Sequence, residues 1–290
     1  MSQSLLTPSL PTPGTLPAAL ERRAAPRLVM EILPADGPVR NALLTSLPAE
    51  ELALLEPHLE RVRLEQRDIL FDAERPILHV YFPETAVVSL VSTLRAGNTV
   101  EVGTAGCEGM AGLSVFLAED ISTVRAVVQI PGVATRISVE DFTRLAAPPG
   151  ALHRLMLRYA AAFLTQVAQT AACNGAHLVE ERCARWLLMT HDRAGRDTFP
   201  LTHEFLAFML AVRRAGVTEA LGALRAQGLV SNGRGVITVV DRAGLERASC
   251  ECYRVVRAHF ERLFGGASGP ESVRRDAAST PHGRSNGRAR

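Results

Sequence analysis

Lysine is absent from this chain of 290 residues, so all 32 basic side chains are arginine. The 30 aspartate and glutamate residues nearly balance them, and the formal net charge is only +2. A charge this small does not by itself indicate nucleic-acid binding. The base composition of the genome is the simplest explanation for the missing lysine. Arginine nevertheless gives every basic contact a planar, two-pronged donor that suits phosphates and guanine edges.

The sequence also lacks a long uninterrupted apolar run, which argues against a membrane-spanning helix. Its first residues lack the basic segment and apolar core of a secretory signal. The five cysteines are odd in number and scattered, which favours reduced thiols. We therefore expect a cytoplasmic protein that makes no membrane contact.

Catalytic motifs are missing as well. The chain contains no Gly-x-Ser-x-Gly elbow, no phosphate-binding Gly-Lys-Ser/Thr loop and no paired-histidine zinc motif. The sequence therefore disfavours an enzyme, and no cofactor is predicted.

A helix-turn-helix pattern occupies residues 201–230. Thr202 is placed to cap a first helix, with Glu204 in the first turn, where a negative charge suits the helix dipole. After a turn, apolar residues recur at helical spacing on one face of a second helix: Val217, Ala220, Leu221 and Leu224. The opposite face is basic or small and carries Arg213, Arg214, Thr218, Gly222 and Arg225. A helix pair of this kind is typical of DNA-binding proteins.

A hairpin signal follows the helix pair directly. The segment Asn232-Gly233-Arg234-Gly235 separates two β-rich runs, and Asn-Gly between such runs predicts a tight turn. The hairpin would be a wing, with Arg234 at its tip near a phosphate. We predict DNA contacts from Thr202, Arg213, Arg214, Thr218, Arg225 and Arg234. The alternatives are an exposed arginine pair at 213–214 and a threonine that only caps its helix.

The region before the helix pair has a different pattern. Short β-rich runs separated by turn residues over 62–137 predict a compact antiparallel barrel or roll. A long helix after Pro148-Pro149-Gly150 carries apolar or small residues on two faces. Such a helix suits pairing of two copies of the chain, although a helix buried within one chain would look the same.

These patterns divide an α+β chain into five parts. We expect a disordered leader over residues 1–37, an effector-sensing β-roll over 38–147 and a dimerisation helix over 148–176. A winged helix-turn-helix follows over 177–264, with one last helix from Asp241 to about Phe264, and then a disordered tail rich in Arg, Gly and Ser over 265–290.

The cysteines offer only a weak metal signal. Cys250 and Cys252 resemble half a metal site, but the segment is predicted to be helical, and residues two apart on a helix point to nearly opposite sides. Cys173 and His177 are four apart, with Cys183 further on, so a redox or metal sensor built on these three is an alternative. Buried thiols and an ordinary histidine are the preferred interpretation, and no metal site is predicted.

The order of elements and the motifs together resemble the Crp/Fnr family of bacterial transcription regulators over residues 40–264. The glycine-containing run 103–113 is similar to the turn in that family's effector-binding β-roll, which resembles a cyclic-nucleotide-binding domain. The resemblance implies a sensory roll, a helix that pairs two subunits, a winged helix-turn-helix that binds palindromic double-stranded DNA, and a contact with RNA polymerase.

Two departures from the family pattern limit what the resemblance implies. The arginine that holds a cyclic-nucleotide phosphate falls on Ser122 or Asp120 here, so cyclic AMP is not the expected effector. Ala215 and Glu219 differ from the residues with which the family's second helix contacts DNA bases, so the family's target sequence is not expected for this protein. Glu219 and the small net charge also leave a second function open, a ligand-sensing module whose helix-turn-helix makes protein contacts only.

The candidate effector pocket is drawn from the glycine run and the segment after it: Gly103, Gly106, Glu108, Gly109, Thr123 and Arg125. Glycine lets a backbone approach a ligand closely, but it serves an ordinary turn equally well. The sequence leaves both interpretations of these glycines open and does not name an effector.

Overall fold

The computed structural model describes residues 30–34, 39–94, 99–147 and 149–265. Most of the predicted leader and tail therefore lies outside the described residues. Where the leader is described, the prediction of disorder was wrong. Ile32 pairs with Val62 as an antiparallel bridge, and Leu33 N donates to Arg61 O at 2.8 Å, so this segment adds to the edge of a sheet.

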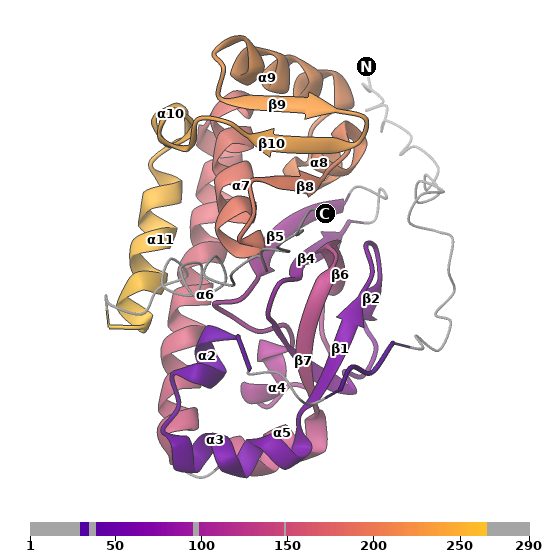
Figure 1. Ribbon diagram of the computed structural model, residues 1–290, viewed down its shortest axis with the longest axis vertical. Coiled ribbons are helices and arrows are strands. Elements are labelled where there is room, and N and C mark those ends of the chain that lie inside the picture. Colours follow the sequence, from indigo (N-terminus) through magenta and orange to yellow (C-terminus); the bar gives the residue numbers. More distant parts are fainter. Residues whose placement is uncertain (1–29, 35–38, 95–98, 148, 266–290) are drawn as a thin grey trace, which may run out of the picture.

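The N-terminal region is an antiparallel roll of two facing sheets preceded by short helices (Figure 1). The helices are α2 (Ala42–Thr45), α3 (Ala49–Leu55) and the 3-10 turn η1 (Glu56–His58). One sheet has the order β1 (Glu60–Leu64), β7 (Gly132–Ser138), β3 (His79–Pro83). The other has the order β2 (Ile69–Phe71), β6 (Arg125–Ile130), β4 (Val87–Thr93), β5 (Thr99–Ala105). The predicted roll is confirmed.

The short helix α4 (Leu113–Phe116) lies between β5 and β6, and two longer helices follow β7. Ser138 caps α5 (Val139–Ala146) by accepting a hydrogen bond of 3.1 Å from Asp141 N. The long helix α6 (Ala151–Ala176) begins on a carboxylate, because Glu51 accepts from the backbone N–H groups of Ala151 and Leu152 at 2.7 and 2.8 Å. A negative charge at this position favours the helix dipole, and it fixes α6 to α3.

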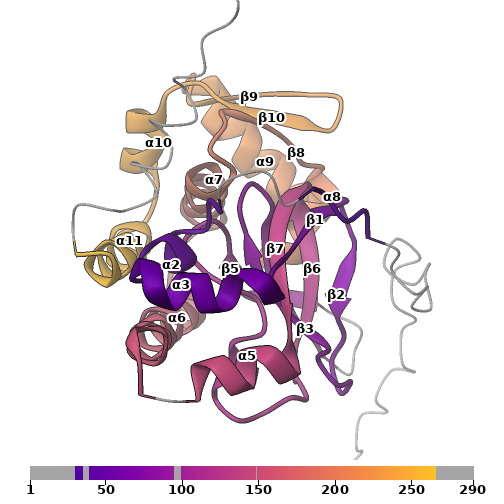
Figure 2. The same cartoon turned by 60° about the horizontal axis from the view of Figure 1, so that its bottom comes forward.

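The C-terminal region is a winged helix-turn-helix. It comprises α7 (Val179–Ala194), β8 (Thr198–Pro200), α8 (His203–Leu210), α9 (Arg214–Ala226), β9 (Val230–Gly233), β10 (Val236–Val239), α10 (Arg242–Ala248) and α11 (Cys252–Leu263). The wing sheet has the order β8-β10-β9. The single last helix predicted from Asp241 is wrong. The extended backbone of Ser249 (φ −82°, ψ 154°) ends α10, and the chain turns so that α11 runs back along α6 (Figures 1 and 2).

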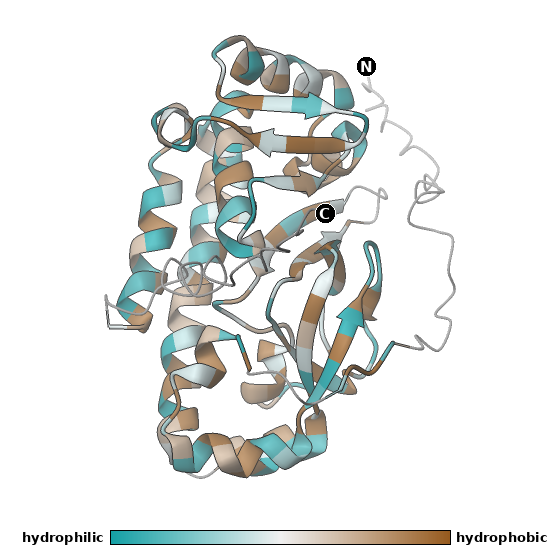
Figure 3. Ribbon diagram, viewed as in Figure 1, coloured by the Kyte–Doolittle hydropathy of each residue, from teal (hydrophilic) through white to brown (hydrophobic). Residues whose placement is uncertain are grey.

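The roll and the winged domain share one hydrophobic core. A continuous cluster of buried residues runs from Leu43 and Val88 in the roll to Leu188 on α7 and Leu221 on α9. Figure 3 shows apolar residues recurring through the strands and along α6. No described helix is long and apolar enough to cross a membrane.

Candidate nucleic-acid interface

The first helix of the pair, α8, begins and ends on specific backbone features. Thr202 Oγ1 accepts a hydrogen bond of 3.1 Å from Phe205 N, which satisfies an otherwise free donor of the first turn. Leu206 and Met209 are buried beneath it. Ala211 ends the helix in the left-handed region at φ 51°, which turns the chain sharply into α9.

The second helix, α9, has the two faces that its sequence predicts. Its apolar residues are buried: Val217, Ala220, Leu221 and Leu224. Arg214, Ala215, Thr218, Glu219 and Arg225 are exposed, and Arg213 is exposed at the N-cap. The buried stripe holds α9 against α7 and α8, so the polar face projects away from the core.

The wing turns within the predicted segment 232–235, in its second half. Gly233 still belongs to β9 and pairs with Val236, so the turn residues are Arg234 and Gly235. The left-handed position that a tight turn needs is filled by Gly235, at φ 75°, rather than by Asn232 or Gly233. Arg234 is therefore at the exposed tip of the wing, as the sequence suggested.

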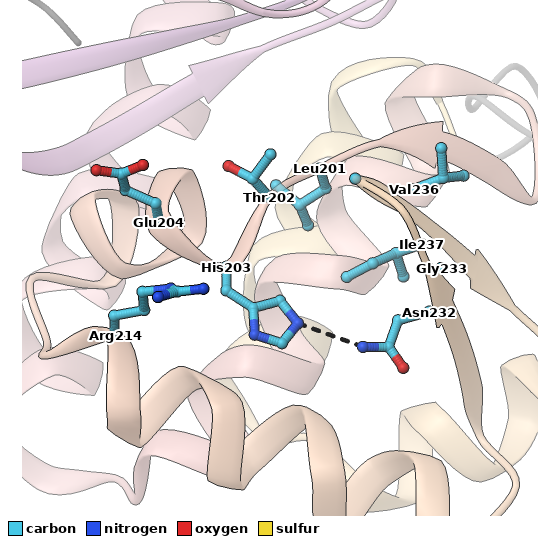
Figure 4. A pocket seen from close by; sticks show the side chains of 10 residues that line it. Leu201, Thr202, His203, Glu204, Arg214, Asn232, Gly233, Val236 and Ile237 are labelled. Atoms are coloured by element: carbon cyan, nitrogen blue, oxygen red, sulfur yellow. Dashed lines mark hydrogen bonds between the residues drawn. The ribbon is translucent and has the colours of Figure 1, made fainter.

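His203 of α8 forms hydrogen bonds to both α9 and the wing, and Figure 4 shows its bond to Asn232 of the wing. Asn232 Nδ2 donates to His203 Nε2 at 3.3 Å, and His203 Nδ1 lies 3.0 Å from Thr218 Oγ1. Since Nε2 accepts, Nδ1 carries the ring proton and donates to Thr218, whose hydroxyl donates to Arg214 O at 3.0 Å. Partial burial, followed by the nearby Arg214, lowers the pKa of His203, which favours this neutral form.

Sequence reasoning missed His203. Its position, directly after the capping Thr202, is the only local signal, and no periodicity links it to Asn232, 29 residues later. The partnership requires knowing that the wing folds back onto the start of α8, which is a tertiary fact.

A cavity of about 480 Å³ opens between the start of α8, the start of α9 and the wing. Figure 4 shows Arg214 and His203 at its edge, facing the strands of the wing. The remaining lining residues are Leu201, Thr202, Glu204, Asn232, Gly233, Gly235, Val236 and Ile237. The cavity is thus lined by the cationic Arg214 and by hydrogen-bonding side chains such as His203 and Asn232. Groups of these kinds contact the phosphates of nucleic acids.

The arginines of this surface differ from those elsewhere in the chain. Arg61, Arg125 and Arg193 are tied to carboxylates at 2.7–2.9 Å. The exposed arginines of the interface form no ion pair with any described residue: Arg213, Arg214, Arg225 and Arg234. Their positive charge is therefore not neutralised by a described neighbour.

The glycine run of the predicted effector pocket packs against helices of its own chain. A Cβ atom on Gly103 would lie 2.8 Å from Phe163, one on Gly106 2.5 Å from Arg193, and one on Gly109 2.7 Å from Tyr159. These glycines allow α6 and α7 to approach the roll closely, which is the packing role that competes with ligand binding.

Of the other predicted pocket residues, Glu108 shares Arg193 with Gly106, whereas Arg125 has a separate partner. Glu108 is 2 % exposed and pairs with Arg193 at 2.7 Å, on the side of α7. Arg125 instead binds Asp72 through two hydrogen bonds of 2.8 and 2.9 Å, and Thr123 is exposed. The grouping of these six residues in an effector pocket therefore stays a prediction.

Comparison with known proteins agrees with this geometry. A family model described as the Crp-like helix-turn-helix domain matches residues 181–248. No curated protein matches the sequence. Among solved structures, FixK2 from Bradyrhizobium japonicum has 18% identity and a TM-score of 0.57, with 66% of this chain and 98% of that chain covered.

Two further structures are similar. A Crp-family transcriptional regulator from Thermus thermophilus has 22% identity and a TM-score of 0.55, over 64% of this chain and 95% of that chain. The c-di-GMP responsive regulator CLP from Xanthomonas campestris has 19% identity and a TM-score of 0.52, over 66% of this chain and 99% of that chain. At these identities the likeness concerns the fold. The family match identifies residues 181–248 as a Crp-like helix-turn-helix domain, and the structural likeness shows that the chain shares the fold of these Crp/Fnr-type regulators.

Proposed function

We propose that two copies of the chain pair through α6 and read a palindromic DNA site. The observation that supports pairing is an exposed apolar stripe on α6. Leu157 and Leu164 are 52% and 68% exposed, and they alternate with the exposed Ala161, Ala168 and Ala171. The spacing of four, three, four and three residues is the repeat of a two-helix seam. A second copy of α6 would cover this stripe by symmetry.

In the proposed complex, α9 of each subunit enters a major groove. Arg213 and Arg214 start the helix and reach base edges or phosphates, while Thr218 and Arg225 lie further along the same face. Thr202 and the wing residue Arg234 flank the helix and contact the backbone. Two such helices bind half-sites about one DNA turn apart.

Direct contacts between the roll and α7 provide a route for a signal to reach the DNA-binding helices. Trp186 Nε1 donates to Glu101 of β5 at 3.0 Å, and Gln129 Nε2 of β6 donates to Thr190 at 2.7 Å. Since α7 also packs on α9, a shift of the roll against α7 would move the recognition helix.

We propose that the effector is not cyclic AMP. The arginine expected to hold a phosphate is replaced at Ser122 or Asp120, and the nearby Arg125 is already bound to Asp72. We also propose that the DNA-bound dimer contacts RNA polymerase, the protein partner expected of a regulator of this type.

Salt dependence separates this function from a module that uses its helix-turn-helix for protein contacts. Each released phosphate counterion contributes about −0.9 to the slope of log affinity against log salt. We expect a slope of about −4 or steeper for duplex DNA, measured by fluorescence anisotropy, since a dimer doubles each contact. A flat salt response with a folded dimer would instead support the protein-contact alternative.

A further inference from the structure

Four potential metal ligands meet at the junction of α6, α10 and α11. Cys173 lies on the last turn of α6, and His177 is the extended residue that follows the helix. Cys250 lies in the turn after α10, and Cys252 is the first residue of α11. The three sulfur atoms and one imidazole nitrogen all lie within 4.8 Å of one another.

The break between α10 and α11 is what makes this arrangement possible. The sequence predicted one continuous helix, on which Cys250 and Cys252 would point in opposite directions. Because Cys250 precedes α11 and is not helical, both thiols turn toward α6. Cys183, which the sequence grouped with Cys173 and His177, is buried in the main core instead and takes no part in the cluster.

Two distances within the cluster are close to those around a single tetrahedral ion, and no pair of ligand atoms is more than 4.8 Å apart. Sulfur at about 2.3 Å and nitrogen at about 2.0 Å from a tetrahedral zinc place the ligand atoms roughly 3.5–3.8 Å apart. Cys173 Sγ and Cys250 Sγ are 3.5 Å apart, and Cys252 Sγ and His177 Nδ1 are 3.4 Å apart. An iron–sulfur cluster would need its cysteines further apart, because several atoms stand between them.

Neighbouring side chains orient the ligands as they do around protein-bound zinc. His177 Nε2 lies 3.3 Å from Glu251 Oε1, so the carboxylate can hold the ring with Nδ1 directed at the thiols. Gln169 Nε2 donates to Cys252 Sγ at 3.1 Å. All three cysteines are at most 4% exposed, which excludes water as a competing ligand.

Positive charge next to the cluster would balance bound thiolates. Arg182 and Arg185 of α7 are 7% and 6% exposed and form no ion pair with a described carboxylate. The Nε atom of each is buried and donates to no described residue. Three thiolates around a divalent ion carry a net charge of −1, so anionic sulfur would add negative charge close to these guanidinium groups, whose terminal nitrogens donate to Asn174, Thr170 and the Leu210 carbonyl.

We propose that Cys173, His177, Cys250 and Cys252 form a closed four-coordinate site for zinc. The ion would join the end of α6 to the start of α11. That joint lies where the chain leaves the winged domain and returns along α6, so zinc would hold the winged domain in a set position relative to α6 (Figures 1 and 2).

Metal content of the full-length chain tests the proposal. We expect about one zinc per chain in protein purified under reducing conditions from zinc-containing medium, measured by mass spectrometry. Cobalt substitution should give the visible bands of a tetrahedral site and the near-ultraviolet bands of thiolate ligands. Chelation should lower the midpoint of thermal unfolding by about 10 °C, and added zinc should restore it.

Matched variants distinguish the site from adventitious binding. Cys252→Ser and His177→Ala should lose the stoichiometric zinc and the cobalt spectrum, whereas Cys183→Ala, which removes a buried thiol outside the cluster, should keep both. Circular dichroism would confirm that each variant is folded. The proposal is overturned if the reduced wild type takes up no zinc, if Cys252→Ser binds as much as wild type, or if the purified protein holds a Cys173–Cys250 disulfide in place of metal.

Discussion

Trp186 of α7 donates its indole hydrogen to Glu101 of β5 at 3.0 Å, in the buried contact between the winged domain and the roll. Burial raises the pKa of Glu101 to about 7, although hydrogen bonds from Ser89 and Trp186 and the nearby Arg185 oppose the rise. Ser89 has a single hydroxyl proton but two acceptors, Glu101 Oε2 at 2.6 Å and Gln129 Oε1 at 2.8 Å. A proton on Glu101 would satisfy both contacts.

Glu101 should make the protein less stable as the pH rises toward neutrality. In the unfolded chain this carboxyl ionises near 4.5, whereas in the fold it ionises near 7. The unfolded state therefore loses its proton first, and the free energy of unfolding should fall between these pH values by about 3 kcal/mol. Above about pH 7 the contribution levels off.

Glu101→Gln isolates this effect, because glutamine keeps the shape and the acceptor for Trp186 but does not titrate. We expect its free energy of unfolding to lack the fall between pH 5 and pH 7 that wild type shows in urea titrations. Glu119→Gln, at an exposed position, is the control and should follow wild type. Identical pH profiles for wild type and Glu101→Gln would show that the carboxyl ionises normally.

Gly106→Ala tests the close approach of the roll to α7. The added methyl would lie 2.5 Å from Cβ and Cγ of Arg193, so the backbone must shift, and the Arg193–Glu108 pair with it. We expect a loss of about 1–3 kcal/mol in unfolding free energy. Gly222→Ala, in the helix α9 with no atom within 4 Å of the added carbon, should gain about 0.5–1 kcal/mol. Equal effects of the two substitutions would contradict the packing role of Gly106.

Leu164→Glu tests pairing through α6. A charge in the centre of the apolar seam should convert the dimer to monomer in analytical ultracentrifugation without unfolding the chain, since Leu164 is 68% exposed in the single subunit. Leu117→Glu, at a residue 58% exposed outside α6, is the matched control and should leave the dimer intact. A Leu164→Glu dimer as tight as wild type would place the interface elsewhere.

Periodicity in the sequence identified most of the fold. The short β-rich runs of the roll, the Thr202 cap and the buried stripe of α9 are local patterns, and each one is found where it was predicted. The wing turn lies in the second half of the predicted segment 232–235, and only the strand register decides between Asn232-Gly233 and Arg234-Gly235 as the turn residues.

The sites were less predictable, because their partners are distant in sequence. Asn232 and His203 are 29 residues apart, and Cys252 and His177 are 75 apart. The cysteine cluster was obscured by one local error: the pattern over 241–264 suits a continuous helix, whereas the chain breaks at Ser249. The glycines at 103, 106 and 109 were ambiguous for a different reason, since a glycine that admits a helix and one that admits a ligand look alike in sequence.

Footprinting on genomic DNA fragments tests the central proposal, a dimer that reads palindromic DNA through α9, most directly. Wild type should protect discrete sites made of two inverted half-sites about one DNA turn apart. Arg214→Ala should weaken these sites about 10-fold or more while changing non-specific binding far less, because removing a side chain that hydrogen-bonds a base edge costs about 1–3 kcal/mol. Folded dimeric wild type that protects no specific site at moderate salt, or an Arg214→Ala variant that protects the same sites equally well, would contradict it.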